Sequence, residues 1–203
     1  MIYISYPSLL TAITVMWLLV RGAVWIKNKR ISLRRELELL TVYGCIVVVA
    51  RFTCFPFDKV NGSLPPLVFD PSRLIPPNTN LIPLVYLCDY DQLGVILLNV
   101  GGNIAMFIPI GIVWPVAFRE LDNWKKALAA GAGFSLFIEI FQLLFYERVT
   151  DTDDLLMNSL GFIIGYGIYS LARIVVKKMK NTRKRQMERT KSEKRVIFQT
   201  QSL

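Results

Sequence analysis

The sequence predicts an all-α fold, a polytopic membrane protein built as a bundle of about five transmembrane helices. Hydrophobic residues make up 53% of the 203 residues, and the mean hydropathy is +0.42. Charged residues make up only 19%, whereas soluble domains carry roughly 25%. Several segments are also apolar over the length of about 20 helical residues that a bilayer core about 30 Å thick requires.

The predicted spans follow one another along the whole chain. The first, third and fifth contain no charged residue, and the second and fourth contain one each, Arg51 and Glu139. We expect the first span to remain in the protein rather than be cleaved as a signal peptide, because its positive charges follow it instead of preceding it. The spans are residues 1–20, 39–57, 92–118, 127–146 and 155–172.

Lysine and arginine are distributed unevenly among the segments that connect the spans. Residues 27–38, 119–126 and 177–203 hold five, three and ten basic residues, whereas residues 58–91 and 147–154 hold two and one. Basic connections face the cytoplasm. The pattern therefore predicts that the N-terminus lies outside and the C-terminus lies in the cytoplasm.

Most of the formal charge of +9 lies in the last 27 residues, where ten basic residues face two acidic ones. A basic tail that follows hydrophobic segments is typical of contact with anionic lipid headgroups, and it argues against a nucleic-acid partner. Residues 58–91 are rich in proline, which is excluded from helix interiors, so we predict an ordered or semi-extended outer loop there.

Two residue types limit the chemistry that this chain can perform. Histidine is absent, which excludes Ser-His-Asp catalysis and His-ligated metal sites. The three cysteines form no Cys-x-x-Cys pair, which excludes a zinc ribbon. A disulfide between Cys54 and Cys88 remains open. We expect no cofactor and no resident metal.

Polar residues inside apolar spans are costly, so each is a candidate for function. In three spans they recur at helical spacing and share one face. Arg51, Asn99 and Glu139 each lie roughly 10 Å below the predicted outer end of their helix at about 1.5 Å per residue. This common depth predicts one polar pocket in the outer half of the membrane. The pocket candidates are Asn99, Asn103, Glu139, Gln142, Arg148, Asp151, Asp153, Asp154, Asn158 and Arg51.

Several candidates also have purely structural interpretations. Asn99 and Gln142 suit hydrogen bonds between helices, and Asp153 or Asp154 suits the N-cap of the last helix. Arg51 can extend toward the membrane surface. Glu139 is the hardest to explain structurally, because a buried carboxylate must be paired or protonated. We expect a nearby arginine, Arg51 or Arg148, to pair with it. The pairs Gly161–Gly165 and Ala129–Gly133 predict close helix packing.

Four motifs together resemble the VanZ-like family over about residues 80–169. They read Asn80-Leu-Ile-Pro83, Gly102-Asn103-Ile-x-Met-Phe-Ile-Pro109-x-Gly111, Ser135-x-x-x-Glu139-x-x-Gln142 and Arg148-x-x-Asp151-x-Asp153-Asp154-x-x-x-Asn158-x-x-Gly161. The resemblance implies a small bacterial protein of the cell membrane that lowers susceptibility to teicoplanin, a glycopeptide antibiotic that carries a lipid. It also suggests three parts: two N-terminal helices (1–57), a VanZ-like domain (58–176) and a basic cytoplasmic tail (177–203).

The leading functional hypothesis is a non-enzymatic pocket for an amphiphile in the outer leaflet. The amphiphile would be a lipoglycopeptide, a lipid-linked wall precursor or a membrane phospholipid. The alternative is a membrane-embedded enzyme acting on a lipid-linked envelope substrate, in which Glu139 is a general base and Asp151, Asp153 and Asp154 hold a divalent cation. A third hypothesis is a scaffold that only organises partners.

The predicted orientation can be tested with cysteines placed in a cysteine-free background. A cysteine near Lys194 should be shielded from an impermeant thiol reagent added to intact cells, because the basic tail faces the cytoplasm. A cysteine between Pro65 and Pro77 should be labelled. Labelling of the tail together with protection of the loop would reverse the orientation and move the pocket to the inner leaflet.

Overall fold

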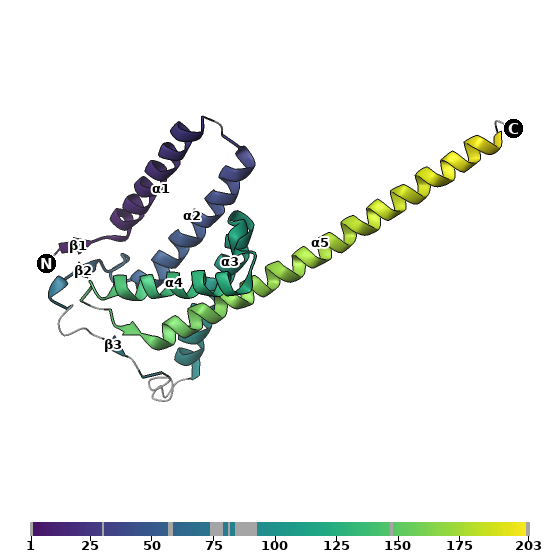
Figure 1. Cartoon of the computed structure of the whole chain (residues 1–203). Coiled ribbons are helices and arrows are strands. Elements are labelled where there is room, and N and C mark those ends of the chain that lie inside the picture. The colour runs from purple at the N-terminus through teal and green to yellow at the C-terminus, as the bar shows by residue number, and fades with distance from the viewer. Residues whose placement is uncertain are drawn as a thin grey trace. The chain divides into compact units, whose positions relative to one another are not determined.

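The computed structural model describes residues 2–29, 31–56, 59–73, 79–80, 82–83, 93–146 and 148–201. The chain divides into two compact units, Met1–Tyr166 and Gly167–Leu203. Five helices account for most of the described residues (Figure 1). They are α1 (Tyr6–Asn28), α2 (Leu33–Cys54), α3 (Leu93–Ala117), α4 (Trp124–Gln142) and α5 (Thr152–Gln201). The predicted all-α fold is thereby confirmed.

Among the described residues, four helices are long and apolar enough to cross a membrane: α1, α2, α3 from Ile96 onward, and α5 up to Glu188. Helix α4 does not join them, because every 18-residue stretch of it contains Lys125, Lys126 and Glu139. It also ends at Gln142, so its apolar part rises only about 24 Å at 1.5 Å per residue. A complete crossing by α4 therefore remains a prediction, as does the orientation of the termini.

Helix α2 begins at Leu33, six residues before the predicted start of the second span. The prediction was wrong because it treated charged residues as a connection, although Arg and Glu are good helix formers. Arg34 and Glu38 form an ion pair at 3.0 Å with i,i+4 spacing, which supports the first helical turn. The connection between α1 and α2 is therefore short.

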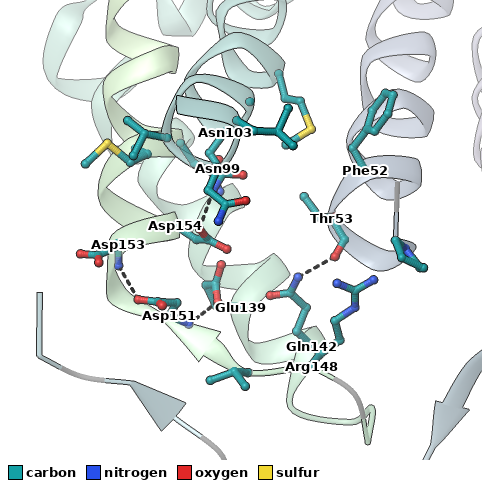
Figure 2. Close-up of a pocket in the computed structure, with 18 of the residues that line it drawn as sticks. Phe52, Thr53, Asn99, Asn103, Glu139, Gln142, Arg148, Asp151, Asp153 and Asp154 are labelled. Carbon is teal, nitrogen blue, oxygen red and sulfur yellow. Dashed lines mark hydrogen bonds between the residues drawn. The ribbon is translucent and has the colours of Figure 1, made fainter. Parts of the chain in front are cut away.

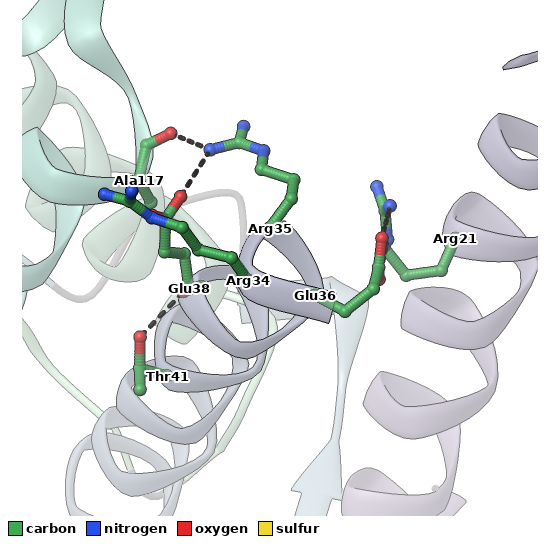
Figure 3. A network of polar contacts seen from close by, with 7 residues as sticks. All are labelled: Arg21, Arg34, Arg35, Glu36, Glu38, Thr41 and Ala117. Atoms are coloured by element: carbon green, nitrogen blue, oxygen red, sulfur yellow. Dashed lines mark hydrogen bonds and ion pairs between the residues drawn. The ribbon is translucent and has the colours of Figure 1, made fainter. Parts of the chain in front are cut away.

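An arginine–glutamate network joins three helices at this end of α2 (Figure 3). The Arg21 Nε in α1 donates to a Glu36 carboxylate oxygen in α2 at 3.0 Å. Arg35 donates to the backbone carbonyl of Ala117, the last residue of α3, and its guanidinium lies 5.5 Å from the centre of the Phe118 ring. A carbonyl at a helix end has no partner within its own helix, so Arg35 satisfies it.

Helices α3 and α5 approach each other through glycines. A Cβ atom on Gly161 would lie 2.2 Å from the Ile104 carbonyl oxygen, and one on Gly165 would lie 2.1 Å from that of Ile108. The predicted close packing of this pair is confirmed. The same prediction for Gly133 was wrong, because a Cβ atom there would have no neighbour within 4 Å; Gly131 instead packs against the Phe162 ring.

Short strands involve the described parts of the connection between α2 and α3. Strand β1 (Ile2–Ile4) pairs antiparallel with β2 (Leu67–Phe69). Strand β3 (Thr79–Asn80) pairs in parallel with β4 (Thr150–Asp151), directly before α5. A short 3-10 helix, η1 (Pro71–Arg73), follows β2, and another, η2 (Arg119–Leu121), connects α3 to α4.

The α3–α5 packing predicts different effects for two glycine substitutions. Gly165→Ala should destabilise the protein by about 1–3 kcal/mol, because its methyl group would overlap backbone atoms that cannot rotate away. Gly101→Ala in α3 is the matched control, since its new methyl group would meet nothing within 4 Å. Thermal unfolding of both variants in detergent measures the difference, and equal unfolding midpoints would contradict the packing.

Candidate functional site

A cavity of about 320 Å³ lies among the end of α2, the first half of α3, the end of α4 and the start of α5 (Figure 2). Its residues come from segments that are far apart in the sequence. Of the ten predicted pocket candidates, nine line it: Asn99, Asn103, Glu139, Gln142, Arg148, Asp151, Asp153, Asp154 and Asn158. The geometry brings these side chains together, and their role in binding remains a prediction.

Arg51 is the candidate that the structure places elsewhere. It is absent from the cavity lining, and its guanidinium donates to the backbone carbonyls of Phe55 and Pro56 at 3.3 and 3.1 Å. The same group lies 5.9 Å from the centre of the Tyr6 ring and 5.2 Å from that of Phe52. Arg51 therefore binds the backbone of the two residues that follow α2 and is not among the residues that line the cavity.

Glu139 is the most buried carboxylate of the cavity, at 2% exposure. Its Oε2 accepts a hydrogen bond from the backbone N–H of Asp151 at 3.0 Å, and its backbone carbonyl accepts one from the Thr150 hydroxyl at 2.8 Å. We expected Arg51 or Arg148 to pair with Glu139. The structure instead shows both arginines donating to backbone carbonyls, and a backbone amide donates to the Glu139 carboxylate. The bonds from Asp151 and Thr150 attach the end of α4 to β4.

Asp151 connects β3 to α5. Its two carboxylate oxygens accept hydrogen bonds from the Asn80 side-chain amide at 3.2 Å each. One of them also accepts the backbone N–H of Asp153 at 2.9 Å, which is the bond expected of an N-cap. The cap of α5 is therefore Asp151, and our assignment of it to Asp153 or Asp154 was wrong.

Two further amides belong to this network. The Asn103 amide in α3 donates to the Asp154 carboxylate in α5. The Asn158 amide donates to the Ser135 hydroxyl in α4 at 3.0 Å, and Asn158 is only 1% exposed. The first bond joins α3 to α5, and the second joins α5 to α4. The polar faces that the spacing predicted for these three helices therefore meet around the cavity.

Gln142 and Arg148 face the end of α2. The Gln142 amide nitrogen donates to the Thr53 carbonyl at 2.7 Å, and an Arg148 nitrogen donates to the Cys54 carbonyl at 2.8 Å. The Gln142 nitrogen therefore forms a hydrogen bond between two helices, α4 and α2, as the structural interpretation of the sequence expected. The partner atoms are backbone carbonyls, which no spacing rule identifies in advance. Cys88, the proposed disulfide partner of Cys54, lies outside the described residues.

Two residues that line the cavity carry a buried oxygen that accepts no hydrogen bond from the described residues: Gln142 Oε1 and Asn158 Oδ1. Both residues are at least nine-tenths buried. A buried acceptor without a donor costs about 1–3 kcal/mol. Both oxygens therefore favour a donor that enters the cavity from outside the chain.

The structure also bears on cation binding. Among the residues it describes, no group of three or more His, Cys, Asp or Glu side chains could hold a metal ion. The Asp151 carboxylate is already engaged by Asn80 and the N–H of Asp153.

Asn80 and Thr150 also position the site but were not among the predicted candidates. Asn80 belongs to the first resembling motif, which was a signal for its importance, yet its bond to Asp151 crosses 71 positions of sequence. Thr150 donates to the Glu139 carbonyl, and no pattern pointed to it.

The part of the chain that forms the cavity lies within a known protein family. The family model VanZ/LLP1 matches residues 41–173, which include every lining residue of the cavity. Protein VanZ of Enterococcus faecium is 34% identical over 70 residues, which are 34% of this chain and 43% of that protein. The match therefore spans less than half the length of this relative. No solved structure matches the chain. On the family match, this chain is a member of the VanZ/LLP1 family.

Proposed function

We propose that this membrane protein binds the headgroup of an amphiphile in the polar cavity and thereby lowers susceptibility to lipid-bearing glycopeptides such as teicoplanin. The observation that carries the proposal is the gathering of nine predicted polar side chains around one cavity in a body of apolar helices. Polar groups in such surroundings are costly and mark binding sites or pathways.

The rim of the cavity suits a molecule that has both a polar and an apolar part. Leu98 and Val149 line the cavity and are 55% and 47% exposed, and Asn99 beside them is exposed as well. A headgroup inserted among the carboxylates would leave its acyl chain against these exposed apolar side chains. Because lipid tails are as apolar as these side chains, the acyl chain exchanges one set of apolar contacts for another, and the headgroup determines the affinity.

The chemistry of the lining supports binding rather than catalysis. Thr53 supplies a hydroxyl to the cavity, but that hydroxyl donates to the Val49 carbonyl of its own helix at 2.9 Å. Glu139, the candidate general base, accepts the N–H of Asp151. A nucleophile next to a base is the usual signature of covalent catalysis, and Thr53 and Glu139 do not supply it.

We also place the protein in the cell membrane, with the cavity in the outer leaflet and the basic continuation of α5 against anionic lipid headgroups of the inner leaflet. The described side chains at residues 171–188 are all exposed. A basic, exposed helix next to a membrane span is attracted by the negative surface potential of anionic lipid.

Expression in a susceptible Gram-positive host tests the proposed function. The wild type should raise the inhibitory concentration of teicoplanin more than that of vancomycin, because teicoplanin carries the acyl chain. Glu139→Gln and Asp154→Asn remove a charge but keep an oxygen for the N–H of Asp151 and for the Asn103 amide. Both variants should return the inhibitory concentration to that of the host alone.

Glu120→Gln is the matched control, because Glu120 is exposed in η2 and does not line the cavity. It should protect as well as the wild type. Immunoblots of membrane fractions must show similar levels of all variants. Full protection by both cavity variants would contradict the proposal and favour a scaffold. Conversion of a lipid-linked substrate by purified protein, abolished by Glu139→Gln, would instead favour the enzymatic alternative.

A further inference from the structure

Two buried amides, those of Gln142 and Asn158, belong to residues that line the cavity. Gln142 and Asn158 both use their nitrogens within the protein, the first on the Thr53 carbonyl and the second on the Ser135 hydroxyl. Their oxygens are buried and accept nothing from the described residues. In Figure 2 the Gln142 oxygen points toward Glu139. A ligand must therefore bring hydrogen-bond donors to satisfy these oxygens.

The charges of the lining favour a cation. Among the described lining residues, four carboxylates face one guanidinium, that of Arg148. Glu139 lies close enough to Asp151 and Asp154 for their charges to interact. Like charges in a buried site destabilise it unless a proton is taken up or a positive charge compensates them, and a bound cation supplies that positive charge. Figure 2 shows the Glu139, Asp151 and Asp154 carboxylates on one side and Arg148 on the other.

These two requirements together select a primary ammonium group. It has three N–H donors, a full positive charge and no acceptor. A sugar hydroxyl supplies a donor but no charge, and a quaternary ammonium supplies charge but no N–H. A divalent metal ion needs a cluster of ligands that the described residues do not form. A free phosphate would meet the carboxylates with a charge of the same sign.

We infer that the cavity recognises a primary ammonium in the headgroup of a membrane lipid. The Gln142 and Asn158 oxygens accept its N–H groups, and the Glu139 and Asp154 carboxylates balance its charge. Arg148, across the cavity, is placed for the phosphate that accompanies the ammonium in a zwitterionic headgroup. This inference rests on the headgroup site proposed above and specifies the chemistry of its ligand.

Lipid binding to the detergent-purified full chain, followed by native mass spectrometry, tests the inference. Four lipids with identical acyl chains serve as probes: phosphatidylethanolamine, lysyl-phosphatidylglycerol, phosphatidylcholine and phosphatidylglycerol. An ammonium lipid, ethanolamine or lysyl, should bind about tenfold or more tightly than the other two, because hydrogen bonds between charged partners are roughly twice as strong as neutral ones. The tighter of the two identifies the source of the ammonium group.

Variants locate the preference within the chain. Glu139→Gln keeps the shape of the side chain and should reduce the preference for ammonium lipids to less than about threefold, because charge-assisted bonds become neutral. Asn158→Leu, which removes one acceptor at similar volume, should act in the same direction. Glu120→Gln should retain the full preference. If Asn158→Leu fails to fold, Glu139→Gln still decides the question.

The outcomes separate this inference from the proposed function. Equal binding of phosphatidylethanolamine and phosphatidylcholine, or tighter binding of phosphatidylglycerol, would overturn the ammonium assignment. If Glu139→Gln nevertheless weakened the binding of the lipid that the wild type binds most tightly, the proposed headgroup site would stand with a different ligand. Equal binding of all four lipids by the wild type and both cavity variants would overturn both proposals.

Discussion

The hydrogen bond from the backbone N–H of Asp151 to the Glu139 carboxylate fixes the end of α4 against the start of α5. A buried carboxylate is tolerated only where such donors reach it. Because this N–H belongs to the residue whose side chain caps α5 and binds Asn80, one short segment organises two helices and a distant loop. The cavity exists because these elements converge on Glu139.

Another side of the cavity is formed by side chains that donate hydrogen bonds to backbone carbonyls at a helix end. The last carbonyls of α2 need donors, and Gln142 and Arg148 supply them. Two side chains of the cavity are therefore held by the main chain of α2. On the opposite side, the glycines of α5 let its backbone touch that of α3, which brings Asn103 within reach of Asp154.

Much of the fold and the membership of the site could be predicted from the sequence, because apolar length and helical spacing depend on local composition. The third predicted span, residues 92–118, agrees with α3 (Leu93–Ala117). The polar helix faces that carry Asn103, Glu139 and Asn158 also line one cavity, as their spacing predicted. The predictions for Arg51 and the α5 cap failed because they depend on which carbonyl or N–H lies nearby in three dimensions. The partner of Asn80 could not be predicted either, since no local pattern encodes a contact across 71 positions.

The contact between Asn80 and Asp151 also affects biosynthesis. At roughly 5–20 residues per second, a ribosome needs several seconds to add the residues that separate Asn80 from Asp151. During this interval α2 and α3 enter the membrane while their share of the polar side chains still lacks its partners. The site is thus completed only after the start of α5 has been added, and a chain truncated before Asp151 would lack the partners of Asn80 and Asn103.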